Sequence, residues 1–466
     1  MDYLSRLLKY TTEDPNFRYH PLCKPLRLTH LMFADDLLLF SKGDAQSIII
    51  LLRTFATFSQ SSGLKMSKGK SNAYFNGVKD SVKTDILQRS GMVEGSLPFK
   101  YLGVPIKSTR LNAQDCRPLI DKILTKNRNL GARKLSYAGR LVLIKAVLKT
   151  FHNYWATMFI LPSGVITRIE SICRNFLWDG GAEYMRSLLV AWEKVCKPKN
   201  EGGLGLKNDA IWNKAVVGKL VWWISSKADH LWVRWVNQIY IKNETWQGYS
   251  PKTDASWYWK KLCKTKNILA EHYNQHQWTS QKGQEYTVAK GYECLRDKGN
   301  TVSWNHIVWS KLTMPKHAFI SWLYHQKAMN ANAKLKRLGC CEEDTCYLCG
   351  RTSETIDHLI FYCAYSRRLV DGLSRWIGES LPTQDILGWR LSLHGSKLRK
   401  DFINSVVNAC IYQVWHQRNS CKFEARILRP ERVIQMVIKD LRTRYSGLRH
   451  QSSDGDGRWI RAIGFH

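Results

Sequence analysis

The sequence contains few acidic residues for its length and no hydrophobic stretch long enough to cross a membrane. Only 38 of the 466 residues are Asp or Glu, against 71 Lys and Arg, so the net charge is +33. The longest apolar runs, such as 37–40 and 48–52, are much shorter than the ~20 residues that a transmembrane helix needs. No basic segment followed by an apolar one, the pattern of a secretory signal, opens the sequence. We therefore expect no membrane-spanning segment, and a polyanion, nucleic acid first, as the partner.

The sequence also lacks internal repeats and the paired cysteines of a secreted protein. Its 13 cysteines are an odd number, and no export signal accompanies them, so disulfides are not expected. Clustered cysteines are instead candidates for metal ligands. With 44% hydrophobic and 23% charged residues the chain is globular, and its length predicts about three domains at roughly 150 residues each.

Two apolar runs, 28–33 and 37–40, flank Ala34, Asp35 and Asp36. This pattern predicts a buried β-hairpin with two carboxylates at its turn. Adjacent carboxylates at ~4 Å repel by about 4 kcal/mol at an effective dielectric of ~20, and a divalent cation turns that repulsion into attraction. Two such ions can activate an attacking hydroxyl and stabilise a leaving phosphate oxygen. Aspartates are common in solvated turns as well, but the apolar flanks favour a metal site with Mg²⁺.

Beyond residue 114 the apolar spacing is helical, and so is most of 400–446. The sequence therefore predicts an α+β fold, with a hairpin at the front and mostly helices behind it. Nine of the 19 tryptophans lie in residues 201–300. Such rings can stack on unpaired bases, but their helical spacing favours packing in a core.

Positive charge is densest in residues 101–200. Lys145 and Lys149 stand four residues apart, a like-charge spacing that destabilises a helix by roughly 0.2–0.5 kcal/mol unless an anion compensates. We expect the phosphate backbone of a nucleic acid to be that anion, although a solvated basic face is the alternative. The predicted nucleic-acid contacts are Arg133, Lys134, Arg140, Lys145 and Lys149.

Cys346, Cys349, His358 and Cys363 follow the spacing C-x2-C-x8-H-x4-C. Three thiolates and one imidazole form a tetrahedral set typical of structural zinc. Residues five apart lie about 140° apart around an ideal helix, so a helix carrying His358 must end or distort near Cys363. The nearby Cys340 and Cys341 are rivals for a ligand position, and Glu354 and Asp357 could start a helix or hold the imidazole. A chance cluster of buried soft residues is the alternative.

Several segments together resemble the reverse transcriptases of plant non-LTR (LINE-type) retrotransposons. The segment LMFADDLLLF at 31–40 resembles the metal-binding hairpin of the polymerase palm, and LPFKYLGVP at 97–105 resembles the turn that supports the primer. In SGLKMSKGKS at 62–71 Ser67 replaces the usual asparagine of that motif. The other matching segments are LSYAGR at 135–140, GGLG at 202–205, TVSW at 301–304 with Pro315-Lys316, which resembles the zinc-binding module of the family, and WHQRN at 415–419.

The resemblance implies a domain order that covers nearly the whole chain. We expect a partial palm at 1–105, a basic helical thumb-like region at 106–200, a Trp-rich helical connector at 201–283, a zinc-binding reverse transcriptase domain at 284–375 and a helical tail at 376–466.

The resemblance also implies the chemistry. Asp35 and Asp36 would be catalytic and bind Mg²⁺, Lys70 would lie near an incoming dNTP, and the partners would be an RNA template and a DNA primer. Family members need a further metal-binding aspartate upstream, so we expect a truncated RNA-directed DNA polymerase that cannot extend a primer alone. A nuclear location is implied by resemblance only. The alternatives are a non-enzymatic zinc-containing nucleic-acid-binding protein and a decayed retroelement fragment.

Overall fold

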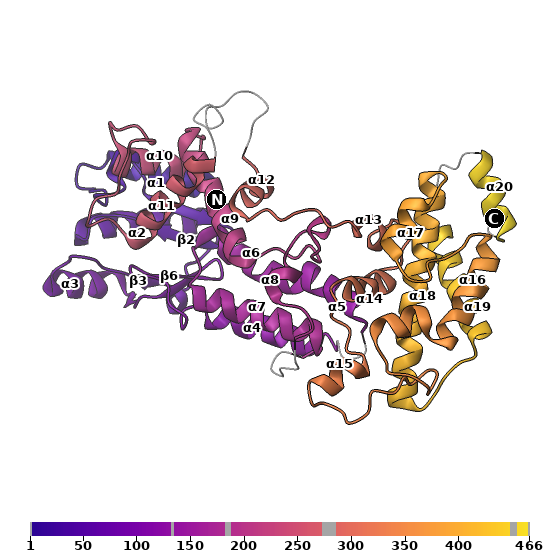
Figure 1. Cartoon of the computed structure of the whole chain (residues 1–466). Helices are drawn as coiled ribbons and strands as arrows, with labels where there is room; N and C mark the ends of the chain where they lie inside the picture. Colours follow the sequence, from indigo (N-terminus) through magenta and orange to yellow (C-terminus); the bar gives the residue numbers. More distant parts are fainter. Residues whose placement is uncertain (1, 132–134, 182–187, 273–285, 448–453, 465–466) are drawn as a thin grey trace. The chain divides into compact units, whose positions relative to one another are not determined.

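The computed structural model describes residues 2–131, 135–181, 188–272, 286–447 and 454–464 (Figure 1). The chain forms two compact units, each assembled from separated segments. The first unit comprises Met1–Arg117, Tyr154–Pro162 and Trp212–Arg296, and the second comprises Pro118–Asn153, Ser163–Ile211 and Asp297–His466.

The first unit begins with two helices packed against a β-hairpin. Leu4 and Leu8 of α1 meet Ile50, Leu51 and Phe58 of α2 in one apolar cluster. In α2 the side chain of Asp44 accepts a hydrogen bond from Ser47 N–H and caps the helix start, and Gly63 ends the helix with a φ of 74°. The elements are α1 (Asp2–Tyr10), β1 (His30–Phe33), β2 (Asp36–Leu39), α2 (Ala45–Ser62), β3 (Asn72–Ala73), α3 (Asp80–Ser90), β4 (Val93–Glu94), β5 (Phe99–Tyr101) and β6 (Val104–Ile106).

These strands form three sheets of two strands each. The pairs β1–β2 and β5–β6 are antiparallel, whereas β3 and β4 are parallel. The predicted hairpin is therefore present, but the prediction that it is buried is wrong. Phe33 is 61% exposed and Leu31 is 36% exposed, because a sheet of only two strands leaves one face of β1 uncovered among the described residues.

The rest of the first unit is a tryptophan-rich helical cluster. Trp222, Trp246 and Trp259 are less than a tenth exposed and share one core with Leu262 and Tyr286. The expectation that these rings pack in a core is confirmed. The helices are α9 (Asp209–Ser225), α10 (Leu231–Val236), α11 (Trp257–His272) and α12 (Val288–Leu295), with a π-helical turn η7 (Asn237–Ile241).

The regular elements of the second unit are helices, apart from an isolated β-bridge between Thr345 and Ser353, among its described residues. Helix α14 packs against α18 and α5, and α16 packs against α19 (Figure 1). The helices are α4 (Arg117–Asn129), α5 (Tyr137–Leu143), α6 (Lys149–Met158), α7 (Ser163–Trp178), α8 (Trp192–Val195), α13 (Asn305–Val308), α14 (Pro315–His325), α15 (Asn332–Arg337), α16 (Ala364–Ile377), α17 (Ile386–Ser392), α18 (Lys397–Glu424), α19 (Pro430–Ser446) and α20 (Asp454–Ala462).

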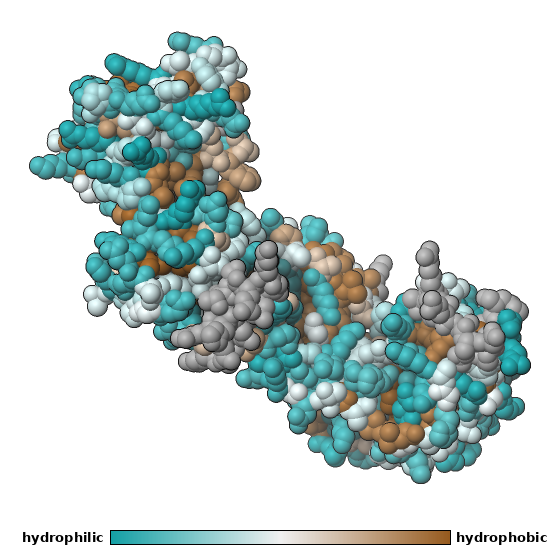
Figure 2. Space-filling model, turned by 90° about the horizontal axis from the view of Figure 1, so that it is seen from above, coloured by the Kyte–Doolittle hydropathy of each residue, from teal (hydrophilic) through white to brown (hydrophobic). Residues whose placement is uncertain are grey.

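The α+β fold class is thus confirmed, with short strands in the first unit and helices in both. No helix within the described residues combines the length and the apolar character that a membrane crossing needs. The face of the molecule shown in Figure 2 is mainly hydrophilic and carries smaller hydrophobic patches.

Candidate functional site

Asp35 and Asp36 lie at the tip of the β1–β2 hairpin. Phe33 pairs with Asp36, so Ala34 and Asp35 form a two-residue turn. Ala34 has a φ of 50°, a left-handed conformation that costs a non-glycine residue roughly 1–2 kcal/mol. This turn leaves both carboxylates exposed and adjacent. Within the described residues, no third His, Cys, Asp or Glu joins them in a group able to hold a metal ion.

A second hairpin, β5–β6, lies within electrostatic reach of this tip. Its turn residues Leu102 and Gly103 both have positive φ, as a type I′ turn requires. The hydroxyl of Tyr154 donates to Leu102 O at 2.7 Å and fixes the turn. Burial raises the pKa of Tyr101, and the carboxylate of Asp36 raises it further. The structure therefore brings together two hairpins that are far apart in the sequence.

Lys70 ends a short 3-10 turn, η3 (Lys68–Lys70), and is exposed. Its backbone N–H donates to Ser67 O at 3.1 Å, so Ser67 holds the turn through its carbonyl. The role of Lys70 toward a nucleotide stays a prediction.

Three of the five predicted nucleic-acid contacts are engaged inside the second unit. Arg140 is 8% exposed and its Nη1 donates to Leu177 O at 3.2 Å. The Lys149 ammonium is buried 2.7 Å from Asp209 Oδ1. Burial would lower the pKa of Lys149, but Asp209 raises it above the ordinary value.

Lys145 differs, because the residue as a whole is exposed although its ammonium is hydrogen-bonded within the protein. The ammonium donates to Leu204 O at 2.7 Å. Desolvation, aided by repulsion from Lys199 and Lys149, lowers the pKa of Lys145 to about 8. The expected phosphate contacts of Lys145, Lys149 and Arg140 stay predictions, and each of these cations also bonds to a protein carbonyl or, for Lys149, to a carboxylate.

Arg133 and Lys134 lie outside the described residues. Helix α4 carries part of the exposed positive charge of this region, and Leu119, Ile123 and Asn127 form its buried face. Lys122 and Lys126 stand one turn apart on an exposed face. Lys122 also lies over the Phe151 ring at 5.3 Å.

The four predicted zinc ligands converge in the second unit. One ligand atom each from Cys346, Cys349, His358 and Cys363 lies within 4.8 Å of the others. Cys346 and Cys349 sit on a tight turn in which Gly350, at a φ of 66°, donates its N–H to Cys346 O. Three sulfurs and one nitrogen at this mutual distance fit tetrahedral zinc. Within the described residues, Cys340 and Cys341 are not part of the group.

The expected helix distortion is present between His358 and Cys363. These residues bracket a π-helical turn, η9 (His358–Tyr362), closed by a hydrogen bond from Cys363 N–H to His358 O. A π turn brings residues five apart onto one side, and the chain then becomes extended at Cys363 before α16 begins.

The thiol of Cys363 is the more acidic of the buried pair it forms with Cys346. A hydrogen bond from Cys346 lowers the pKa of Cys363, and the N–H groups of Ser366 and Tyr365 at the start of α16 lower it further. The shared proton raises the pKa of Cys346. A nearby cation or metal would favour deprotonation of both thiols.

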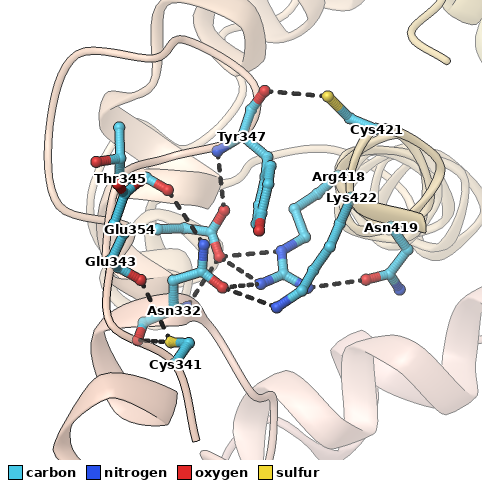
Figure 3. A network of polar contacts seen from close by, with 10 residues as sticks. All are labelled: Asn332, Cys341, Glu343, Thr345, Tyr347, Glu354, Arg418, Asn419, Cys421 and Lys422. Atoms are coloured by element: carbon cyan, nitrogen blue, oxygen red, sulfur yellow. Dashed lines mark hydrogen bonds and ion pairs between the residues drawn. The ribbon is translucent and has the colours of Figure 1, made fainter. Parts of the chain in front are cut away.

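The sequence allowed Glu354 to hold the His358 imidazole, but the structure places another residue there. Thr352 Oγ1 lies 3.2 Å from His358 Nδ1. Glu354 is buried in a polar network that joins the zinc-ligand turn to α18 (Figure 3). Its Oε1 lies 2.7 Å from Arg418 Nη2, and its Oε2 accepts from Tyr347 N–H at 3.2 Å.

Two further side chains complete the network from α15 and α18. Asn332 Oδ1 accepts hydrogen bonds from Arg418 at 2.8 Å and from Lys422 at 3.1 Å (Figure 3). No pattern in the sequence predicts this arrangement. Arg418 was visible only as part of a tail segment, and no local spacing pairs it with Glu354, 64 residues away.

Two sequence families match this chain, the first over the segment with the carboxylates and the second over the segment with the zinc ligands. Residues 2–106 match the family described as reverse transcriptase (RNA-dependent DNA polymerase), and residues 286–369 match zinc-binding in reverse transcriptase. In these two segments the chain is similar to reverse transcriptases. The first match contains Asp35, Asp36 and Lys70, and the second contains all four cysteine and histidine ligands.

Two proteins of Arabidopsis thaliana are similar to parts of this chain. One, named as a candidate ribonuclease H protein, is 30% identical over 164 residues, which are 34% of this chain and 26% of that protein. The other, an uncharacterized mitochondrial protein, is 25% identical over 118 residues, which are 25% of this chain and 77% of that protein. The chain thus spans about a quarter of the first relative.

Proposed function

We propose that this chain works as part of an RNA-directed DNA polymerase, with Asp35 and Asp36 holding Mg²⁺ beside a primer terminus. The observation that carries the proposal is the exposed position of both carboxylates at a hairpin tip. Mg²⁺ binds one or two carboxylates and keeps its other positions for water and substrate phosphates. An accessible pair at a tip suits that coordination better than a buried pair would.

The remaining functional residues follow from the same proposal. Lys122 and Lys126 on α4 would contact the phosphates of an RNA template paired with a DNA primer, and Lys70 would lie near the dNTP. Zinc at Cys346, Cys349, His358 and Cys363 would hold the second family segment together without taking part in chemistry, because four protein ligands leave no position for water.

A third carboxylate is needed for full two-metal chemistry in this proposal. The described residues bring no further acid, histidine or cysteine to Asp35 and Asp36. We therefore expect this 466-residue chain to bind template–primer without extending it, until a segment carrying the missing aspartate is supplied.

Primer extension and binding by the purified chain test the proposal together. We expect Mg²⁺ to strengthen binding of an RNA–DNA template–primer to the wild type but not to Asp35→Asn/Asp36→Asn. Without Mg²⁺ the double variant should bind more tightly than the wild type, because two charges that repel phosphate are gone. Glu13→Gln removes an exposed acid elsewhere in the first unit and serves as the control. Absence of any Mg²⁺ effect contradicts the assignment of Asp35 and Asp36 as metal ligands. Mg²⁺-dependent extension contradicts the expectation that the chain needs a third carboxylate from elsewhere.

A second candidate function is nucleic-acid binding without catalysis. The two-carboxylate site favours this function as well. A site without a third carboxylate cannot complete two-metal catalysis, but it does not prevent a duplex from binding. It predicts equal binding by wild type and the Asn double variant in Mg²⁺, and no rescue of extension by an added palm segment.

A further inference from the structure

A groove in the second unit is lined by three segments that the zinc and carboxylate sites do not use. It has a volume of about 280 Å³, slightly below the ~300–1,000 Å³ of pockets for drug-sized ligands. One wall is the last three turns of α18, and the other is formed by the starts of α5 and α14. Its lining residues are Ser136, Tyr137, Ala138, Lys316, Phe319, Ile320, Tyr412, Trp415, His416, Asn419, Ser420, Phe423 and Glu424.

The α18 wall is a continuous stripe along one helix face. Its members recur at intervals of three and four residues, which places them on one side of a helix. They combine the rings of Tyr412, Trp415, His416 and Phe423 with the polar groups of Asn419, Ser420 and Glu424. Phe423 is 74% exposed and His416 is exposed, although large apolar rings are usually covered. An exposed ring beside a groove is available for stacking on a flat ligand.

The opposite wall supplies a packed aromatic base. Tyr137 stacks on the buried Phe319 ring, with 5.1 Å between centroids and 15° between planes. Lys316 lies over the Tyr412 ring at 5.3 Å and pairs with Asp440 at 2.7 Å. The rings are thus held in place before any ligand arrives.

The charges of the groove favour an uncharged flat ligand over a phosphate. Lys316 is already neutralised by Asp440, and Glu424 would repel an anion. The amide of Asn419, the hydroxyl of Ser420 and the carboxylate of Glu424 can all bond to the edge of a ring that carries donors and acceptors.

We propose that this groove binds a single unpaired nucleobase of a single-stranded nucleic acid. This inference rests on the proposed function, in which the chain binds nucleic acid. The overall charge of +33 attracts that polyanion to the protein. The base enters between the α18 stripe and the Tyr137 wall, and its sugar–phosphate backbone stays outside. Stacking on aromatic side chains accepts every base, so the site holds strands with little sequence preference.

Binding of a 12-nucleotide single-stranded RNA and of a matched RNA–DNA duplex to the full chain tests the proposal by fluorescence anisotropy. Phe423→Ala should weaken single-strand binding roughly 5- to 150-fold, the range expected when one base no longer stacks. Phe423→Leu should do the same, because it keeps the bulk and loses the ring. Leu391→Ala removes another exposed apolar side chain, 86% exposed, and should change nothing. Duplex binding should be unchanged in all three.

The outcomes separate this site from the proposed function. Unchanged single-strand affinity in Phe423→Ala, or a wild type that binds duplex but not single strands, overturns the groove alone. A wild type that binds neither overturns the proposed function as well. Cross-linking of RNA that contains 4-thiouridine to the wild type is a second test that needs no variant. We expect adducts on the peptide that spans Tyr412 to Phe423, and adducts found only elsewhere overturn the site.

Discussion

Arg418 of α18 and Glu354 of the zinc-ligand segment form an ion pair with 2.7 Å between Nη2 and Oε1. The two side chains are 3% and 0% exposed. Glu354 also accepts the N–H of Tyr347, which lies between Cys346 and Cys349 in sequence. The position of the zinc-ligand turn therefore depends on a helix that begins well beyond Cys363, at Lys397.

Arg418→Met should lower the free energy of unfolding by about 3–5 kcal/mol, because it leaves Glu354 charged and buried without its partner. Urea unfolding followed by circular dichroism measures this loss. Adding Glu354→Gln should recover part of it, since no buried charge then remains. Arg351→Met changes an exposed arginine of the same segment and should have little effect. Equal losses in Arg418→Met and Arg351→Met would contradict a structural role for the pair.

Purified protein should contain one zinc ion per chain, bound by the four converging ligands. Cys346→Ser should abolish it, whereas Cys340→Ser should retain it, because Cys340 is outside the group. Elemental analysis measures the metal. Since structural zinc in small modules contributes apparent binding free energies of about 10–16 kcal/mol, removal by a chelator should also unfold the matched segment. Zinc retained by Cys346→Ser would show that the ligand set is wrong.

The Lys149–Asp209 pair should make stability depend on acid pH. Burial alone would raise the pKa of Asp209, but Lys149 and His152 lower it below the ordinary value of 3.8. A carboxyl with a lowered folded-state pKa contributes stability that is complete above its unfolded pKa and is lost as pH falls through its folded pKa. We expect this loss below about pH 3.8 in the wild type. Asp209→Asn should be less stable at pH 7 and should show a shallower decline in acid.

Salt dependence should separate exposed from occupied lysines. Lys122→Ala/Lys126→Ala should reduce the slope of log affinity against log salt by about 0.9 for each phosphate that is no longer neutralised. Lys145→Ala should leave the slope unchanged, because its ammonium bonds to Leu204 O. Titration of a template–primer at several salt concentrations measures both. A reduced slope in Lys145→Ala would support the prediction that Lys145 contacts phosphate.

Local patterns were sufficient for some features. The two apolar runs that flank Ala34, Asp35 and Asp36 predicted a hairpin with both acids at its turn, because strand formation and turn chemistry act over a few neighbouring residues. The distortion between His358 and Cys363 followed from helix geometry alone. The same patterns could not tell that β1 has an uncovered face, since burial depends on which strands lie beside it.

Short-range patterns could not predict which lysine and arginine side chains bond to other groups of the protein. The spacing of Lys145 and Lys149 gives their positions on a helix but not what covers that helix, and Asp209 lies 60 residues further along the chain than Lys149. The pairing of Arg418 with Glu354 likewise joins segments 64 residues apart.

The amino-acid sequence by itself determined the ligand types, the order of the family segments and the excess of positive charge, because these depend on composition and on short-range spacing. Only the tertiary structure decided which charges meet solvent and which meet each other. A buried ion pair requires two distant segments to exclude water from the same place, and no short-range pattern records that event.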